Sequence, residues 1–265
     1  MASELCMNCF SVKGQYEVCP FCGYVEGTKP KQPHYLTPGT ILANHFIVGN
    51  AIGFGGFGIT YKCFDTTLGV VVAVKEFYPA GLVNRAPGEC SVGLLSGDKQ
   101  NQYQAQLKRF LMEAQSIAQF GKAKDIVNVY DFFEANNTAY IIMEYVDGDT
   151  LKKYLEQNGK MSPEDVLKVM KPIMKALEQM HRTGLIHRDV SPDNIMIRRD
   201  GQVKLIDFGS ARVAQEDDEK SLTIMLKRGF SPEEQYRSKG HQGAWTDIYA
   251  LCATMYYMLT GKIPP

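Results

Sequence analysis

Three oxygen-bearing side chains that could bind a metal ion or accept a proton follow apolar, strand-like stretches of the chain. Asp189 and Asn194 lie in a polar loop between two short apolar stretches, and Asp207 follows the apolar residues 203–206. We expect these strand ends to converge and to bring the three side chains together. Two of them could be ligands of a hard cation such as Mg²⁺ while the third acts as a base. This set is what chemistry on a magnesium-bound nucleotide requires.

A second set of residues predicts a loop that holds phosphate groups. Gly53, Gly55 and Gly58 form the pattern G-x-G-x-x-G, with Gly56 added, between two stretches rich in branched and aromatic residues. Without Cβ atoms, the backbone of such a loop can come close to phosphate oxygens. The motif alone is weak, because a flexible hairpin would show it too. A second strand with Lys75 follows, which places a cation at the loop and favours nucleotide binding.

An amphipathic helix is predicted after this hairpin, because apolar residues recur at spacings of three and four over residues 107–118. Glu113 lies at the edge of its apolar stripe. Such a glutamate is by default a surface residue. If it faces Lys75, however, it would hold the lysine ammonium in the pair that phosphoryl transfer requires. Another helix is predicted to begin at Pro163, because Ser162 is a suitable N-cap.

Four cysteines near the N-terminus have the spacing of a metal site. Cys6 and Cys9 form one C-x2-C pair, and Cys19 and Cys22 form another. Two such turns can present four thiolates to one tetrahedral ion, which predicts structural Zn²⁺ with no open position for catalysis. Two disulfides or a redox C-x-x-C motif are the alternatives, which a cytoplasmic chain without a βαβ context disfavours. Residues 6–23 resemble the zinc-ribbon family, and we expect them to serve docking or regulation.

The composition limits the classes of protein to which the chain can belong. Its 265 residues are 45% hydrophobic and 22% charged with a formal net charge of zero, as in ordinary globular proteins. The balance of charge argues against a dedicated nucleic-acid binder. No stretch reaches the roughly 18 to 20 apolar residues of a membrane span, and no secretory signal is visible. We therefore expect a cytoplasmic protein, with a membrane anchor beyond residue 265 left open.

In the order of its motifs, the chain resembles the eukaryotic-like protein kinase family. These motifs are the glycine-rich loop, the strand with Ala73-Val74-Lys75, the helix with Glu113, the loop with His187-Arg188-Asp189 and Asn194, and Asp207-Phe208-Gly209. The resemblance covers about residues 45–265 and is greatest to the bacterial serine/threonine branch. It implies an α+β, bilobal fold with a β-rich N-lobe at about 44–146. A helical C-lobe would follow at about 147–265, incomplete at its C-terminus. Residues 1–27 would then be the zinc ribbon and residues 28–43 a linker.

The resemblance also implies a nucleotide site and assigns its residues. The glycine-rich loop would cover the ATP phosphates, with Phe57 at its tip. Met143 would be the gatekeeper, and the backbone groups of Glu144 and Val146 would pair with adenine. The residues implied to bind the nucleotide are Ile52, Gly53, Gly55, Gly56, Phe57, Gly58, Ala73, Lys75, Glu113, Met143, Glu144 and Val146.

Four residues would carry the reaction itself. Lys75 would bind the α- and β-phosphates, and Asp189 would accept or orient the proton of the substrate hydroxyl. Asn194 and Asp207 would bind Mg²⁺, with Mn²⁺ as an alternative ion. The protein would mainly align the reactants and neutralise charge.

Several positions depart from the family pattern. Ser191 stands where serine/threonine kinases usually carry a lysine that contacts the γ-phosphate, so turnover is lowered or the cation comes from elsewhere. The stretch between the lysine strand and the glutamate helix is longer than usual, and we expect it to decorate the N-lobe rather than bind a partner. Ser221 and Thr223 are candidate phosphorylation sites for which the Arg188 guanidinium could be the receptor.

The leading hypothesis is an ATP-dependent protein kinase that phosphorylates serine or threonine on proteins, including itself. Its partners would be those protein substrates and a protein that binds the zinc ribbon, without nucleic acid. One alternative, prompted by Ser191, is a zinc-ribbon scaffold whose kinase-like part binds nucleotide but scarcely catalyses. The other is a small-molecule phosphotransferase, although Arg188 stands where those enzymes usually have glycine.

Overall fold

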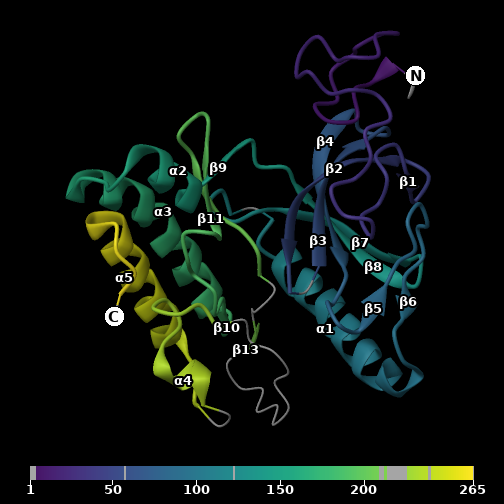
Figure 1. Ribbon diagram of the computed structural model, residues 1–265. Coiled ribbons are helices and arrows are strands. Elements are labelled where there is room, and N and C mark those ends of the chain that lie inside the picture. The colour runs from purple at the N-terminus through teal and green to yellow at the C-terminus, as the bar shows by residue number, and fades with distance from the viewer. Residues whose placement is uncertain are drawn as a thin grey trace. The chain divides into compact units, whose positions relative to one another are not determined.

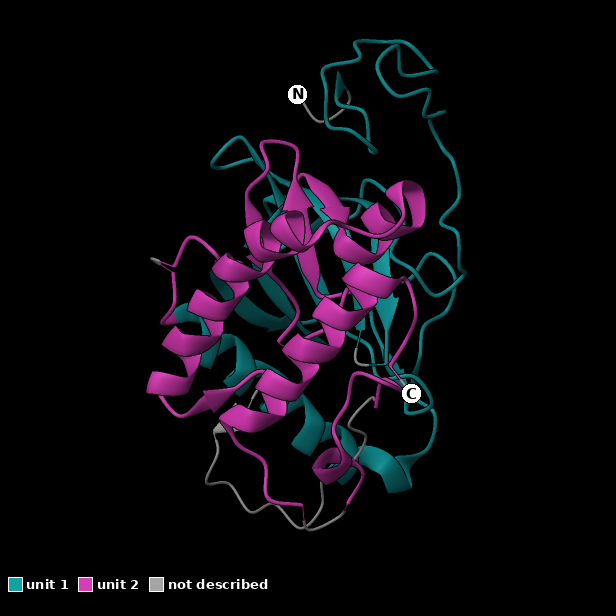
Figure 2. Cartoon of the chain, turned by 90° about the vertical axis from the view of Figure 1, so that its left-hand side faces the viewer, with its two compact units in different colours: residues 1–118, 129–145 teal, residues 119–128, 146–265 magenta. Residues whose placement is uncertain are grey.

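The computed structural model describes residues 4–56, 58–121, 123–208, 212–213, 226–237 and 240–264. The chain forms two compact units, which Figure 2 shows in different colours. Unit 1 comprises residues 1–118 and 129–145, and unit 2 comprises residues 119–128 and 146–265. As expected for the two lobes, the first unit is rich in β-strands and the second is largely helical. No helix within the described ranges is both long and apolar enough to cross a membrane.

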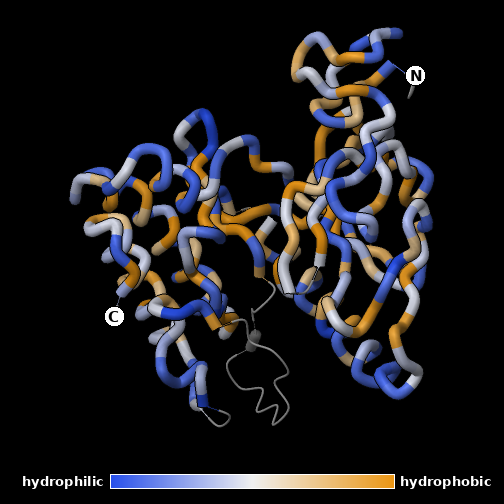
Figure 3. Tube along the Cα trace, in the orientation of Figure 1, coloured by the Kyte–Doolittle hydropathy of each residue, from blue (hydrophilic) through white to orange (hydrophobic). Residues whose placement is uncertain are grey.

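A six-stranded antiparallel sheet is the centre of unit 1 (Figure 1). Its strand order is β1-β2-β3-β4-β8-β7. Branched and aromatic residues dominate these strands, and the apolar start of β4 is visible as an orange stretch in Figure 3. The strands are β1 (Ile41–Leu42), β2 (Phe46–Gly55), β3 (Gly58–Asp65), β4 (Val70–Phe77), β7 (Val129–Ala135) and β8 (Thr138–Glu144).

The helix α1 (Gln100–Ala118) contacts β7 and β8 and buries the apolar stripe that the sequence predicts. Before it, β5 (Val83–Asn84) and β6 (Gly93–Leu94) form a short hairpin, and the 3₁₀ turn η2 (Gly97–Lys99) leads into the helix. The segment assigned as a linker also contributes to this core, because Leu36 is fully buried in it.

The cysteine-rich module packs directly on the sheet. Met7 and Phe10 form a small apolar cluster with Ile47 of β2, and the ring of Phe10 stacks on Phe64 at 5.7 Å between centroids. A Cβ atom at Gly49 would lie 2.6 Å from the Met7 carbonyl oxygen, so this close approach requires glycine. The module is therefore part of unit 1 and not merely tethered to it.

Unit 2 is built around two long helices, α3 (Pro163–Arg182) and α5 (Ala244–Thr260). The predicted start of α3 is confirmed, since the Ser162 side chain accepts a hydrogen bond from the Asp165 backbone N–H. The remaining elements are β9 (Gly148–Thr150), α2 (Leu151–Asn158), β10 (Leu185–Ile186), β11 (Ile195–Arg198), β12 (Val203–Leu205), β13 (Arg212–Val213) and α4 (Glu233–Tyr236). In these short sheets β11 pairs with β9 and β12, and β10 pairs with β13.

Candidate active site

The loop of residues 187–194, between β10 and β11, holds Asp189 in one position. The Asn194 side-chain amide donates to the backbone carbonyl oxygen of Asp189 at 2.8 Å and to its carboxylate Oδ2 at 2.7 Å. The backbone carbonyl of Asn194 accepts from the Ile206 N–H at 2.8 Å, which extends the β11–β12 pairing to the residue before Asp207. The structure thus brings Asp189 and Asn194 into direct contact, next to the end of the Asp207 strand.

The environment of Asp189 makes it a stronger base than an ordinary aspartate. Burial raises the pKa of its carboxyl group, because the charged form loses solvation, and the nearby negative charge of Asp207 acts in the same direction. The ammonium of Lys227 opposes this rise. A raised pKa in an aspartate that can still reach a reactant is typical of a proton acceptor.

Lys227, from the segment that precedes α4, lies against this loop. Its Nζ atom is 3.0 Å from Asp189 Oδ1 and donates to Ser191 Oγ at 2.8 Å. The same Nζ lies 3.8 Å from Asp193 Oδ2. Serine/threonine kinases usually have a lysine at the position of Ser191. Here the Ser191 hydroxyl accepts a hydrogen bond from a lysine elsewhere in the chain, Lys227.

A buried carboxylate at the start of α5 fixes the other end of the loop. Asp247 Oδ1 accepts from the Arg188 backbone N–H at 2.7 Å, and its Oδ2 accepts from the His187 backbone N–H at 2.9 Å. The His181 ring completes the set, with its Nε2 atom 2.7 Å from Oδ2. These bonds stabilise Arg188 at a φ of 68°, an unfavourable value for a residue other than glycine.

Asp207 and Phe208 follow β12 in a sharp change of backbone direction. Asp207 has a φ of 57° and an exposed side chain, whereas Phe208 is buried with its ring 4.8 Å from the ring of His187. His187 is itself fully buried, and this burial lowers its pKa, so the ring is neutral at physiological pH. The aromatic contact fixes the segment that carries Asp207.

The donor set in unit 2 fits a magnesium ion. Both N–H groups of the Asn194 amide are used on Asp189, so its oxygen is the atom with which it could bind a cation. Asp207 offers an exposed carboxylate on the adjoining strand end. One amide oxygen and one carboxylate, with water and phosphate oxygens as the other ligands, form a typical Mg²⁺ site.

In unit 1, Lys75 lies on β4, opposite Thr60 of β3 and Ile141 of β8. Its side chain is largely buried, with 8% of its surface exposed. Glu113 lies on α1 with a half-buried side chain. Both residues make polar interactions, so neither is a freely solvated surface residue.

Glu76, the next residue of β4, points to the opposite face of the sheet because strand side chains alternate. It is completely buried and accepts hydrogen bonds from the hydroxyls of Tyr61 (3.1 Å) and Tyr140 (3.0 Å). Arg85 makes a bidentate ion pair with the same carboxylate. Burial opposes the positive charge of Arg85, but Glu76 outweighs it and raises the arginine pKa.

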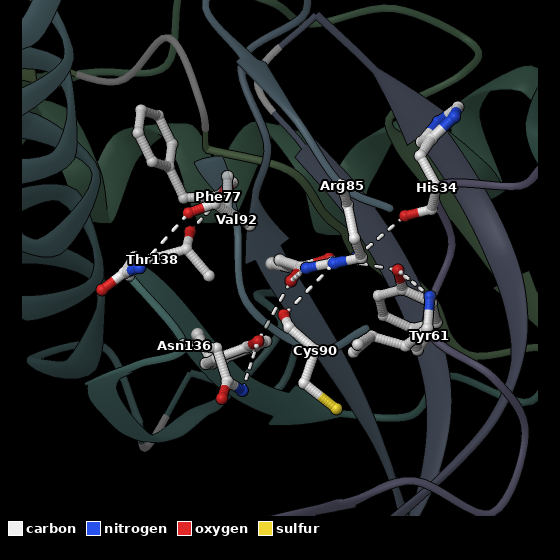
Figure 4. A network of polar contacts seen from close by, with 12 residues as sticks. His34, Tyr61, Phe77, Arg85, Cys90, Val92, Asn136 and Thr138 are labelled. Carbon is white, nitrogen blue, oxygen red and sulfur yellow. Dashed lines mark hydrogen bonds and ion pairs between the residues drawn. The ribbon is translucent and has the colours of Figure 1, made fainter. Parts of the chain in front are cut away.

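Arg85 connects several segments of unit 1, as Figure 4 shows. Its guanidinium donates to the carbonyl oxygens of His34 (2.9 Å) and Cys90 (3.2 Å). His34 belongs to the segment expected to be a linker, and Cys90 belongs to the insertion that precedes α1. The insertion is therefore anchored in the core beside β4.

The glycine-rich loop connects β2 and β3, with Gly55 opposite Gly58 in the register. A Cβ atom at Gly58 would lie 2.0 Å from the Glu76 carbonyl oxygen, so packing alone requires this glycine. Gly53 and Gly55 have no such constraint, since a Cβ there would meet nothing closer than 3.8 Å or nothing at all. Phe57 lies outside the described residues.

All but one of the residues implied to contact adenine lie on strands of the six-stranded sheet of unit 1. Ala73 of β4 is directly opposite Met143 of β8, and Glu144 ends that strand. Ile52 of β2 is exposed over 51% of its surface, which is high for an isoleucine. Val146 is buried and begins the second stretch of unit 2.

Comparison with known proteins identifies this arrangement. The protein kinase domain model matches residues 46–265. The chain belongs to the protein kinase family. A probable serine/threonine-protein kinase of Clostridium acetobutylicum is 34% identical over 232 residues, which are 85% of this chain and 31% of the relative. PknL of Mycobacterium tuberculosis is 32% identical over 225 residues, which are 84% of this chain and 51% of the relative.

Among solved structures, the apo form of PpkA-294 superposes on this kinase with a TM-score of 0.74. The two share 37% sequence identity over 88% of this chain and 81% of the other. This chain spans between about a third and a half of the length of the curated relatives named above.

Two adjacent glutamates near the end of the activation segment have different partners. Glu234 accepts from the Thr246 hydroxyl of α5 at 2.9 Å, whereas Glu233 pairs with the exposed Arg237 within its own turn. Gln235 Nε2 donates to the Arg188 carbonyl oxygen at 2.8 Å, which joins this segment to the catalytic loop. Ser221 and Thr223 lie outside the described residues.

The four N-terminal cysteines form a cluster that fits one metal ion. Their Sγ atoms all lie within 4.8 Å of one another, with Cys6 and Cys22 at 3.5 Å and Cys9 and Cys19 at 3.7 Å. Four sulfurs at about 2.3 Å from a tetrahedral zinc ion would be spaced at about these distances. The structure thus brings together the cysteines that the spacing singles out.

Sequence reasoning missed three polar residues that shape this site. Lys227 lies shortly before Ser231 and Pro232, and nothing in the sequence marks it as the cation that contacts position 191. Asp247 is a single acid at the start of an otherwise apolar helix, a pattern that often marks a buried anchor. For Arg85, no signal in the sequence points to its buried partner.

Proposed function

We propose that this kinase domain transfers the γ-phosphoryl group of Mg-ATP to serine or threonine hydroxyls of proteins, including its own. The observation that carries the proposal is the partly buried Asp189 carboxylate, held by the Asn194 amide in a loop that Asp247 anchors. The curated relatives that the chain matches are named as serine/threonine-protein kinases, which supports the choice of acceptor.

The proposed reaction assigns the proton and the electron pairs as follows. The substrate hydroxyl oxygen forms a new bond to the γ-phosphorus while the bond from that phosphorus to the β,γ-bridging oxygen breaks. The electron pair of the broken bond leaves with ADP. Asp189 accepts the hydroxyl proton, which its raised pKa favours.

The proposal gives residues of each unit a role of their own. In unit 1, Lys75 and the backbone of residues 53–58 would bind the ATP phosphates, and Ile52, Ala73 and Met143 would contact the base. In unit 2, Asn194 and Asp207 would hold Mg²⁺, which neutralises phosphate charge when bound. Gly53 and Gly55 support this assignment, because packing does not explain either glycine.

The two alternatives predicted from Ser191 have less support. The relatives are named neither as inactive scaffolds nor as small-molecule phosphotransferases. The chain also has a lysine, Lys227, beside Asp189 despite the serine at position 191. The loop therefore still has a positive charge beside it, although the lysine that the family usually has at position 191 is replaced by serine.

A transfer assay with γ-labelled ATP tests the proposal. Asp189→Asn keeps the shape of the side chain but removes the base, and we expect transfer to fall by roughly 10² to 10⁴. Asp200→Asn is the matched control, since Asp200 is an exposed carboxylate on the β11–β12 turn of the same unit. Phosphosite mapping of the labelled protein then reports serine or threonine. Equal labelling of wild type and Asp189→Asn would overturn the proposal.

We also propose that the cysteine cluster holds one structural Zn²⁺ ion and thereby folds residues 4–27. Elemental analysis of the purified chain should give one zinc per molecule. Cys9→Ser/Cys19→Ser should lose it, while Cys252→Ser should retain it, since Cys252 is exposed on α5. Zinc bound in equal amount to the double variant would exclude this site.

A further inference from the structure

The ammonium of Lys227 is shared among the acidic and hydroxyl groups of the catalytic loop. Nζ donates to Ser191 Oγ at 2.8 Å and pairs with Asp189 Oδ1 at 3.0 Å. Ser191 is fully buried, while the side chains of Asp189 and Lys227 keep 18% and 25% of their surface exposed. The contact therefore lies at the edge of the core, where a reactant can reach it.

The segment that carries Lys227 is held by its own hydrogen bonds. The Lys227 N–H donates to Ser231 Oγ at 3.0 Å, and its carbonyl oxygen accepts from the N–H groups of Phe230 and Ser231, each at 2.9 Å. Further along, Gln235 donates to the backbone of the catalytic loop. Such local bonds reduce the conformational freedom of the lysine backbone before any substrate binds.

An ammonium has three N–H donors, and two of them are used on Ser191 and Asp189. Asp193 Oδ2, at 3.8 Å, is too distant for a hydrogen bond. Among the residues that the structure describes, no other acceptor is within hydrogen-bond distance of this ammonium, so one donor is left for an additional acceptor beside the Asp189 carboxylate. A phosphoryl group in transfer is such an acceptor, since negative charge is spread over its outer oxygens.

We propose that Lys227 contacts the transferring phosphoryl group and supplies, from the segment before α4, the cation that serine/threonine kinases usually carry at position 191. The proposal rests on the kinase activity proposed above. Ser191 then serves as a hydrogen-bond partner of Lys227. Its side chain is short enough for the ammonium to approach the loop, and its hydroxyl accepts a hydrogen bond from that ammonium. The lysine acts as a point charge that stabilises the transition state more than the ground state.

The test compares two lysines that contact the same loop. Lys227→Met removes the cation proposed to be catalytic. Lys152→Met is the matched control, because Lys152 pairs with Asp193 at 3.1 Å, is 50% exposed and has no contact with Asp189. We expect Lys227→Met to lower kcat for γ-phosphoryl transfer by about 100-fold or more, as loss of one preorganised donor does. Lys152→Met should remain within about threefold of wild type, and both should bind Mg-ATP with unchanged Kd by calorimetry.

A second pair of variants separates charge from structure. Lys227→Gln keeps a polar side chain of similar reach and should lose activity like Lys227→Met, with an unchanged melting temperature. Ser191→Lys/Lys227→Met moves the charge to the usual family position and should regain at least tenfold in kcat over Lys227→Met. Wild-type kcat in Lys227→Met, or a gain in activity from release of Asp189, would overturn the proposal, as would a folded double variant without any regain. Absence of transfer by wild type itself would instead reject the proposed function.

Discussion

Two carboxylate–cation pairs, one in each unit, show how differently the same chemistry is used in this protein. In unit 1, Glu76 and Arg85 are completely buried, and the carboxylate also accepts from two tyrosine hydroxyls. In unit 2, Asp189 and Lys227 remain partly exposed, and within the described part of the chain the lysine has one donor without a strong acceptor. The first pair has its hydrogen-bonding capacity filled by the fold, while the second has capacity left for a reactant.

The difference follows from where each pair obtains its partners. Arg85 is fixed by the backbone carbonyls of Cys90, in its own insertion, and of His34, which is 51 positions away in the sequence. Lys227 is fixed by a single loop and by its own segment. A saturated pair stabilises and does nothing else, whereas an incompletely saturated pair at an accessible edge can bind and react.

Arg85→Met should give the largest effect, because it leaves the Glu76 charge buried without its partner. We expect the free energy of unfolding to fall by about 3–5 kcal/mol. By contrast, Lys227→Met should change it by about 1 kcal/mol or less, since that pair is partly solvated. Urea unfolding followed by circular dichroism measures both. Arg182→Met is the control for loss of an arginine, because its pair with Glu178 is on the surface. Equal losses in the Arg85 and Lys227 variants would remove the distinction between the two pairs.

Asp247→Asn tests whether Asp247, which holds the catalytic loop but does not itself react, affects stability and transfer together. The amide cannot accept in all the places where both carboxylate oxygens accept now, so at least one bond to His187, Arg188 or His181 is lost. We expect a loss of about 1.5–3 kcal/mol in unfolding free energy. Transfer should also fall, because the loop that holds Asp189 loosens. Stability measured by urea and kcat measured by label should decrease together, and a decrease in only one of them would contradict the anchoring role.

Gly58→Ala and Gly55→Ala separate a glycine required by packing from one that packing leaves unexplained. A methyl group at position 58 would collide with the backbone oxygen of Glu76, and we expect a loss of about 1–3 kcal/mol in unfolding free energy. At position 55 a methyl group meets open space, so stability should be unchanged while the Kd for Mg-ATP rises. Thermal melting and calorimetric titration of both variants check this. An unchanged nucleotide affinity in Gly55→Ala would argue against a phosphate-binding role for that position.

Some of these features could be predicted from the sequence alone, and others could not. The bilobal kinase fold and the start of α3 at Pro163 are confirmed, because the order of motifs and local capping signals determine them. Alternation along the strand places Glu76 on the face opposite Lys75, but the pairing of Glu76 with Arg85 could not be predicted, since nothing in the sequence indicates what covers that face. Its partner, Arg85, comes from the insertion between β4 and α1, and no feature of that stretch indicates a buried ion pair.

The catalytic loop shows the same limit on a smaller scale. Its residues could be assigned by resemblance, and the bond from Asn194 to Asp189 is local enough to follow from the motif. The contact of Lys227 with Ser191 joins positions 36 residues apart and depends on how the activation segment returns to the loop. Sequence reasoning could recognise that a cation was missing at position 191, but only the tertiary structure indicates which residue supplies one.

The smallest expected effect concerns the pH dependence of transfer. Burial raises the pKa of Asp189, so the acid limb of the kcat profile should lie at higher pH than an ordinary aspartate would give, because the protonated carboxyl cannot accept a proton. Lys227 opposes that rise. Removing the lysine charge in Lys227→Gln should therefore move the acid limb to still higher pH, measured against the plateau of the variant itself, while Lys152→Met leaves it in place. An acid limb that stays in place or moves to lower pH would mean that Lys227 does not affect the pKa of Asp189 in the working enzyme. The pair would then have no more influence on catalysis than an ion pair on the surface.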